Sequence, residues 1–281
     1  MAKIGVVAAV TCQGRGSGIL AGMPPSAAVD SSTVCLTLDL DWAPDYVLED
    51  TRQLLRQAGL PTTIFATHQS PAVTALLSLP GCETGVHPNF LGDPDEDAVL
   101  TRLLTAFPTA VGVRSHELYF DSRLLPLFQR KGMRYFSNDL MFLHSGLEPY
   151  YDWSGLVRLP LFWEDDVHCL YFDGRFDCAA LRLDQPGLKV LNFHPVHLFL
   201  NTREIAGYQA AKPSLADPTA ARKLRREGPG IRALFLDVVG QLRGAEMRTL
   251  GALAEKFRAL HVFGGRTAER FAQEARKEHA P

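Results

Sequence analysis

Short β-prone runs alternate with stretches of helical periodicity between residues 33 and 193, and this alternation is what most constrains the fold. The first pair is residues 34–38, followed by Asp45 to Ala58, whose apolar residues recur at helical spacing up to the expected stop at Gly59. Repeated β and α segments predict a parallel sheet covered by helices, and hence an α/β fold.

The alternation continues along most of the chain. Further strands are expected at 62–66, 83–86, 110–113, 134–136, 156–161, 169–172 and 188–193, and further helices at 71–79, 94–107 and 121–131. Past residue 201 the pattern is helical, at 220–226, 231–242 and 248–260. Because no low-complexity linker interrupts the pattern, we expect one domain over residues 33–281 that ends in a C-terminal helical extension.

Residues 1–32 precede the first expected strand, and we expect them to form a disordered N-terminal extension. The apolar run 4–10 is at the lower limit for a signal-peptide core, and glycine-rich sequence without a clear cleavage site follows it. Met23 is an alternative initiator.

Charge balance and cysteine content exclude several classes of protein. Lys and Arg total 29 against 31 Asp and Glu, and this net charge of −2 is not typical of a protein that binds nucleic acid. No stretch approaches the roughly 20 uninterrupted apolar residues of a membrane span. The five cysteines form no CxxC pair, so we expect a reduced, cytoplasmic setting. None of these features specifies the oligomeric state.

Polar side chains gather where the predicted strands end. They are Asp39, Asp41, His68, His87, Arg114, His116, Asn138, Asp139, His194 and His197, and they include five of the nine histidines. The carboxyl ends of parallel strands meet at one edge of a sheet or one mouth of a barrel, where active sites form. We therefore expect these side chains to converge.

Asp39 and Asp41 leave the first strand two residues apart, so they share a face. One carboxylate can bind a metal while the other acts beside it as a base. Asp41 with two imidazoles would make a three-ligand site that stays open to water, as a catalytic metal requires. The alternative is that the aspartates cap the following helix or pair with an arginine.

Four short motifs in this order resemble those of the polysaccharide deacetylase superfamily of metal-dependent carbohydrate esterases. They are 37–41 (TLDLD), 83–87 (ETGVH), 113–116 (VRSH) and 191–194 (LNFH). The resemblance implies a distorted (β/α) barrel. It also implies that Asp39 is the catalytic base, that Arg114 holds this base, that Asp41 and His87 bind the metal, and that His194 is the general acid.

One position departs from the family pattern. The second motif normally has another histidine four residues after the first, and here that position is Leu91. The third metal ligand must then come from elsewhere, and His116 is the first choice and Asn89 the second. His68 and His197 are less favoured as ligands. The alternative for His116 is that it is only hydrogen-bonded behind Arg114.

Three further residues are expected to bind substrate. They are His68, His197 and Trp163, the last within the aromatic and acidic run 159–166. A tryptophan can stack on a sugar face while nearby acids bind its hydroxyl groups. The alternatives are that Trp163 packs in the core with Asp165 paired to Arg114, and that 194–197 is a structural turn. The aromatic group at 149–153 is expected to cover the barrel rather than line its mouth.

The resemblance implies a metal-dependent hydrolase that removes an acetyl group from an acetylated sugar. Its expected cofactor is a divalent metal, zinc first, with Co, Mn, Fe or Ni as alternatives, and its expected partner is a carbohydrate. A cytoplasmic enzyme would act on a precursor of surface polysaccharide. Two other functions stay open: a cyclic amide or imide hydrolase on the same fold, and a catalytically inactive carbohydrate-binding relative.

Overall fold

The structure of the protein is a computed structural model that describes residues 32–93, 95–171 and 175–263. The N-terminal extension expected over residues 1–32 lies outside the described residues, apart from Ser32. In the described part of the chain, no helix is both long and apolar enough to cross a lipid bilayer.

A nine-stranded sheet, curled into a half-barrel, forms the centre of the fold. Its strands follow the order β6-β7-β5-β4-β3-β2-β1-β9-β8. Their bounds are β1 Ser32–Asp39, β2 Thr62–Ala66, β3 Cys82–Val86, β4 Gly112–Val113, β5 Tyr135–Phe136, β6 Tyr150–Tyr151, β7 Val157–Arg158, β8 Leu161–Glu164 and β9 Gly187–Phe193. All neighbouring pairs are parallel except β6 and β7. The predicted α/β fold of the distorted (β/α) barrel type is confirmed.

The segment 157–164, which contains β7 and β8, contributes strands near both ends of the sheet. β7 pairs with β5, and β8, which begins after Leu159 and Pro160, pairs with β9. Leu161 also forms a bridge with Leu140. The sequence predicts a single strand here, but Pro160 has no N–H to donate to a ladder, and the strand changes partners at this point. The two edges of the sheet are thereby brought round toward each other.

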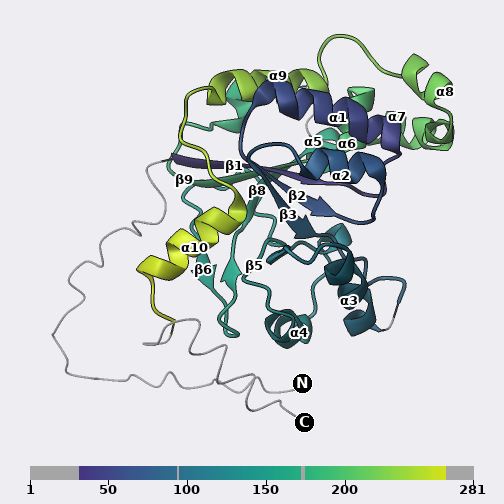
Figure 1. Ribbon diagram of the computed structural model, residues 1–281. Coiled ribbons are helices and arrows are strands. Elements are labelled where there is room, and N and C mark those ends of the chain that lie inside the picture. Colours follow the sequence, from purple (N-terminus) through teal and green to yellow (C-terminus); the bar gives the residue numbers. More distant parts are fainter. Residues whose placement is uncertain (1–31, 94, 172–174, 264–281) are drawn as a thin grey trace, which may run out of the picture.

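Ten α-helices and three 3-10 turns surround the sheet in the described residues. The helices are α1 Asp45–Ala58, α2 Pro71–Leu77, α3 Glu96–Ala106, α4 Leu124–Arg130, α5 Asp165–Tyr171, α6 Pro195–Leu200, α7 Ile205–Ala211, α8 Pro218–Lys223, α9 Ile231–Leu242 and α10 Leu250–Leu260, and the turns are η1 His116–Leu118, η2 Cys178–Leu181 and η3 Lys212–Ala216. Figure 1 shows α1, α2 and α9 on one side of the central strands and α3, α4 and α10 on the other.

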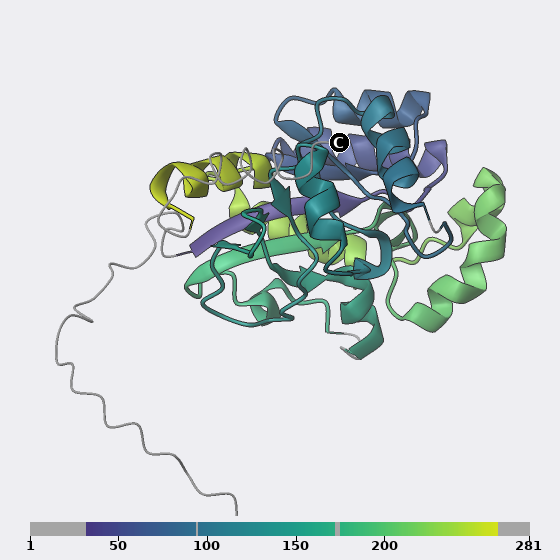
Figure 2. The ribbon, with the colours of Figure 1, turned by 90° about the horizontal axis from the view of Figure 1, so that it is seen from below.

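The C-terminal helix α10 lies at the end of the barrel where the strands begin. The N–H groups of its first turn bond to the sheet: Leu250 N donates to Thr63 Oγ1 (2.9 Å), and Gly251 N donates to Glu83 Oε2 (2.8 Å). These bonds supply partners that a helix start lacks within the helix. Figure 2 shows α10 and the pair α7 and α8 at opposite ends of the molecule.

One predicted strand is wrong. Residues 169–172 are expected as a strand, but α5 occupies Asp165–Tyr171. The buried residues Asp165, His168 and Cys169 recur at helical spacing. His168 Nδ1 accepts a hydrogen bond from Trp163 Nε1 (3.2 Å), which holds the helix against the end of β8. This tertiary contact outweighs the local β-propensity.

Candidate active site

Two turns at the carboxyl ends of the strands have an unusual backbone conformation. They carry Asp41 and His116, two side chains that could hold a metal ion. After β1, Asp41 and Trp42 have φ values of 42° and 53°, and after β4, Glu117 and Leu118 have 53° and 51°. Left-handed conformations cost non-glycine residues on the order of 1–3 kcal/mol and cluster at functional sites. The fold therefore holds these two turns in positions that local preference would not choose.

Asp39, the last residue of β1, is buried and is held at both carboxylate oxygens. Arg114 Nη1 lies 3.0 Å from Asp39 Oδ1, and Asn192 Nδ2 donates to Asp39 Oδ2 at 2.9 Å. Arg114 Nη1 also donates to Asn192 Oδ1 (2.7 Å) and to Thr37 Oγ1 (2.9 Å). Thr37 and Asn192 are register partners on β1 and β9, so the sheet itself aligns this network.

Arg114 has no exposed surface, and each of its three guanidinium nitrogens donates a hydrogen bond. Besides Asp39, it donates to Ser137 O (2.8 Å) and to Ser137 Oγ (3.0 Å), and it lies 4.4 Å from the centroid of the Phe65 ring. A buried cation with this many partners fixes its neighbour in one orientation. Arg114 thus sets the position of the Asp39 carboxylate.

Asp41, His87 and His116 bring three donor atoms together. Asp41 Oδ1 lies 3.1 Å from His87 Nε2 and 3.2 Å from His116 Nδ1, and the three ligand atoms all lie within 4.8 Å of one another. Burial disfavours the charge of Asp41, but hydrogen bonds to His116 and His87 outweigh it and hold the pKa of Asp41 below its usual range. These three residues are called the ligand triad below.

The ligand triad fits a divalent metal. Donor atoms around tetrahedral zinc with bonds of about 2.0–2.1 Å are about 3.3 Å apart, close to both distances from Asp41. One carboxylate and two imidazoles also leave a coordination position free for water or substrate. The other ring nitrogen of His87, Nδ1, is buried and has no hydrogen-bond partner. It lies 3.9 Å from Asp39 Oδ1. The donor types, their spacing and the adjacent carboxylate all suit a catalytic metal.

The alternative third ligand, Asn89, makes its side-chain hydrogen bond within its own loop. Its Oδ1 accepts a hydrogen bond from Leu91 N (2.9 Å), and Leu91 itself is 52% exposed. His68 follows β2, and its Nδ1 lies 2.9 Å from Thr67 Oγ1. The residue that converges on Asp41 and His87 is therefore His116.

His194 faces the ligand triad from the end of β9. Its Nε2 lies 3.7 Å from Asp41 Oδ2, and its Nδ1 and backbone N bond to Asp165 at 2.6 and 2.7 Å. Burial alone would lower the pKa of His194, but the carboxylates of Asp166 and Asp165 outweigh it and raise that pKa well above the usual value. These carboxylates therefore favour the protonated form of His194.

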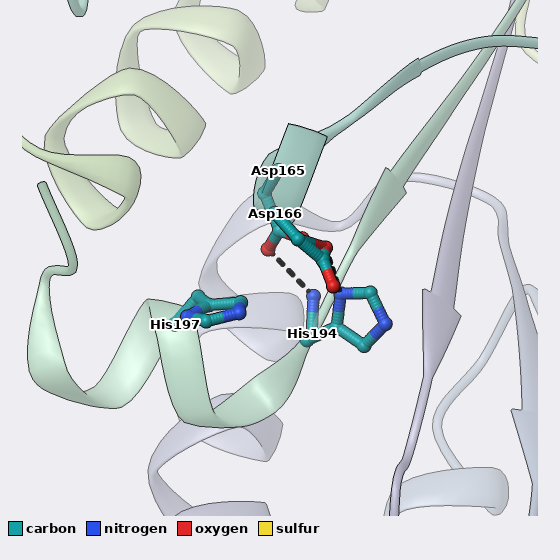
Figure 3. Close-up of side chains that lie close together, drawn as sticks. All are labelled: Asp165, Asp166, His194 and His197. Carbon is teal, nitrogen blue, oxygen red and sulfur yellow. Dashed lines mark hydrogen bonds and ion pairs between the residues drawn. The ribbon is translucent and has the colours of Figure 1, made fainter. Parts of the chain in front are cut away.

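A second group of possible metal donors lies around the same histidine. Asp165, Asp166, His194 and His197 each offer an atom within 4.8 Å of the others. Figure 3 shows Asp165 and Asp166 at the start of α5 facing His194, with His197 set apart on α6. His194 Nδ1 is bonded to Asp165, and His197 Nδ1 lies 3.0 Å from Thr202 Oγ1. Because a carboxylate accepts a hydrogen bond from His194 Nδ1, this second group is better suited to keeping His194 protonated than to binding a metal.

A cavity of about 60 Å³ opens among these groups. Its walls include Asp39, the ligand triad, His194, Ser115, Glu164 and Asp166. Ser115 Oγ and Glu164 Oε2 are buried there without a hydrogen-bond partner. Burial, followed by the nearby charge of Asp166, raises the pKa of Glu164 to about 8. Glu164 can then donate a hydrogen bond to a group held in the cavity.

The residues expected to bind substrate do not line this cavity. Trp163 has no exposed surface, and its ring packs 5.0 Å from that of Phe193, so it occupies the core and cannot stack on a sugar. His197 is buried, and its ring lies 4.7 Å from that of Tyr208. The aromatic group 149–153 forms strand β6 at the edge of the sheet, which agrees with a covering role.

Sequence reasoning missed the roles of Asn192, Asp165 and Glu164. Asn192 stands two residues before His194 on one strand, so period-two spacing already placed both side chains on one face. Asp165 was considered as a partner of Arg114, but its carboxylate bonds to His194 instead. Glu164 is the last residue of β8 and Asp165 the first of α5, so correct assignment of that strand end would have added these acids to the site.

Known proteins are similar to this chain in sequence and in structure. A family model described as WbmS-like polysaccharide deacetylase matches residues 36–212. A solved structure from Bordetella bronchiseptica, described as a polysaccharide deacetylase involved in O-antigen biosynthesis, is 36% identical with a TM-score of 0.68, covering 75% of this chain and 91% of that chain. One from Mycobacterium smegmatis, described as a polysaccharide deacetylase, is 22% identical with a TM-score of 0.47, covering 79% and 94%. No curated protein matches the chain.

Proposed function

The chain belongs to the WbmS-like polysaccharide deacetylase family, and from this membership we propose that it is a metal-dependent hydrolase that removes an acetyl group from an acetylated sugar. The observation that carries the proposal is the convergence of three possible ligand atoms beside a buried carboxylate held at both oxygens and a histidine held by Asp165. Metal-assisted hydrolysis of an amide uses each of these elements: a cation to polarise the acyl oxygen, a base for the water and an acid for the leaving nitrogen.

Asp41, His87 and His116 would hold the metal. When bound there, a divalent cation such as zinc polarises the acyl oxygen and lowers the pKa of water. Zinc is our first choice because one carboxylate and two imidazoles suit it, and Co, Mn, Fe or Ni accept the same donors.

Asp39 takes the proton of the attacking water. It cannot rotate to become a further ligand, because Arg114 and Asn192 hold its two oxygens. The hydrogen bonds from Arg114 and Asn192 keep the Asp39 carboxylate aligned for this proton transfer. Asp39 therefore acts as the general base.

His194 supplies a proton to the leaving nitrogen, which departs poorly as an anion. Its Nδ1 is fixed by Asp165, so Nε2 is the atom directed at the ligand triad. The raised pKa of His194 favours this protonated form. Glu164 and Ser115, which have free polar atoms in the same cavity, would bind polar groups of the substrate.

The substrate we propose is a carbohydrate precursor of surface polysaccharide, processed in the cytoplasm. The Bordetella bronchiseptica protein described as acting in O-antigen biosynthesis supports this class. Cys35, Cys82, Cys169 and Cys178 are free thiols, the state that a reducing compartment maintains.

Metal analysis and acetate release test the proposal together. The full chain, purified under mild conditions, should hold close to one equivalent of divalent metal and release acetate from N-acetylated sugars. Chelation should abolish acetate release, and zinc should restore it. Less than about a tenth of an equivalent after incubation with metal would instead support an inactive binding protein, and turnover of cyclic ureides without acetate release would support an imide hydrolase.

Two variants identify the third ligand. We expect His116→Ala to lower metal affinity by more than about a hundredfold, because it removes one of three direct ligands. Asn89→Ala is the matched control and should bind metal like the parent, because Asn89 Oδ1 is engaged by Leu91 N. The opposite result would make Asn89 the ligand.

A further inference from the structure

A second, larger cavity adjoins the ligand triad. Its volume is about 440 Å³, and it shares Asp41 and His116 with the small cavity. Its remaining walls come from the β1–α1 turn, through Trp42, and from the α7–η3 segment, through Tyr208 and Lys212. Ligand clefts typically measure about 300–1,000 Å³. This groove is therefore large enough for a sugar ring whose acetyl group enters the small cavity.

Trp42 occupies the groove wall in a turn closed by a hydrogen bond from Ala43 N to Leu40 O (2.9 Å). Its φ of 53° is disfavoured for a bulky side chain, and its indole is nevertheless 45% exposed. The Trp42 ring stands edge-on to the ring of His116, with centroids 5.0 Å apart. An exposed aromatic face beside the ligand triad is where a sugar ring can stack.

Tyr208 provides a second aromatic wall on a firm support. Behind it lies the buried ring of His197, 4.7 Å away, which is itself held by Thr202. The η3 turn that follows is tied to α1 by a hydrogen bond from Tyr46 to the carbonyl oxygen of Leu215 (2.9 Å). His197 thus supports the Tyr208 ring from the buried side.

Lys212 places a cation on this wall. It is exposed, and its Nζ lies 6.0 Å from the centroid of the Tyr208 ring, a contact that uses none of its three hydrogen-bond donors. The small cavity beside it is lined by carboxyl groups, namely those of Asp39, Asp41, Glu164 and Asp166. A cation at this position marks where a ligand's negative charge would be favoured.

We propose that this groove binds the sugar ring of an anionic substrate, with the ring against Trp42 and Tyr208 and with a phosphate or carboxylate of the substrate at Lys212. This inference rests on the proposed deacetylase function, because the reacting acetyl group must reach the ligand triad from the groove. It adds a substrate class: acetylated sugars with a negative charge away from the acetyl group.

Calorimetric titration of the zinc-loaded full chain tests the inference with three probes. These are N-acetylglucosamine 1-phosphate, N-acetylmuramic acid and the neutral methyl glycoside of N-acetylglucosamine. At least one anionic probe should bind about fivefold more tightly than the neutral one, the size expected for an exposed ion pair. The preferred probe tells whether the anion is a phosphate or a carboxylate.

Lys212→Met should remove this preference without weakening the neutral probe, and Trp42→Ala should weaken all three probes alike. Lys223→Met, which neutralises an exposed lysine of α8, is the matched control and should keep the preference. Equal binding of the three probes, binding of none, or a preference that survives in Lys212→Met would overturn the inference. Acetate release with no charge preference would leave the proposed function intact, and a charge preference without acetate release would count against that function alone.

Discussion

Asp39 is the residue on which the proposed chemistry depends most directly. It lies between Arg114 and Asn192, and His87 Nδ1 is 3.9 Å from its Oδ1. The ligand triad uses Asp41, two residues further along the chain, so metal binding and proton transfer are assigned to different carboxylates. This separation allows one function to be removed while the other is kept.

Asp39→Asn should abolish turnover while metal binding persists. The amide is nearly isosteric with the carboxylate but cannot accept the proton of water, so we expect kcat to fall by about 10²–10⁴-fold. Metal content, measured by atomic emission, should equal that of the parent. Loss of metal in this variant would mean that Asp39 is a ligand rather than the base.

Asp165→Asn should change the pH dependence of kcat. His194 must be protonated to act as an acid, so activity falls as pH rises through its pKa, which is raised in the folded protein. Removing the charge of Asp165 lowers this pKa, and the alkaline fall should begin on the order of one pH unit lower. Asp184→Asn, at an exposed site, is the control. An unshifted profile would show that His194 does not set the alkaline limb.

At the level of secondary-structure elements, α10 has a structural task at the end of the barrel opposite the site. Glu83 accepts hydrogen bonds from Gly251 N and from Tyr135 Oη, and Thr63 accepts one from Leu250 N. A Cβ on residue 251 would lie 2.7–2.8 Å from the Glu83 carboxylate. A methyl group at this position would therefore displace the Glu83 carboxylate from these hydrogen bonds.

Gly251→Ala should destabilise the fold by about 1–3 kcal/mol, because Glu83 or α10 must move to admit the methyl group. Gly240→Ala in α9 is the matched control: a Cβ there meets nothing within 4 Å, and alanine should stabilise the helix by about 0.5–1 kcal/mol. Urea unfolding monitored by circular dichroism measures both changes. Equal effects of the two substitutions would show that α10 does not dock as described.

At the scale of the whole molecule, the metal proposed for the ligand triad would link the site to the stability of the fold. The ligand triad joins the turn after β1, the end of β3 and the turn after β4, which are distant in sequence. An unfolded chain does not hold these donors together, so a metal binds the folded state preferentially.

Zinc should therefore raise the melting temperature. At a free concentration of about 100 times Kd, the stabilisation is about 2.7 kcal/mol, which corresponds to about 5–10 °C for a chain of this size. Scanning calorimetry of the chelated and zinc-loaded protein measures the shift. The shift should disappear in His116→Ala and persist in Asn89→Ala, and a shift of equal size in both variants would contradict the assigned ligand.

Much of the architecture could be read from local patterns. The strand from Ser32 to Asp39 follows from a continuous β-prone run, and the helix from Asp45 to Ala58 follows from its apolar periodicity and from the glycine that ends it. The segment 156–164 and helix α5 could not be read in this way, because Pro160 and the contact between Trp163 and His168 decide them. Such contacts depend on residues that the chain brings together only after folding.

For the site, local sequence determined which side chains stand at the strand ends, because side chains alternate along a strand and parallel strands end at one edge. It thereby gathered Asp39, Asp41, His87, Arg114 and His194. Only the tertiary structure decided which of them touch, that His116 and not Asn89 reaches Asp41, and that Trp163 is buried while Trp42 is exposed. Those outcomes follow from the curl of the sheet and from two strained turns, and neither is encoded in the spacing of neighbouring residues.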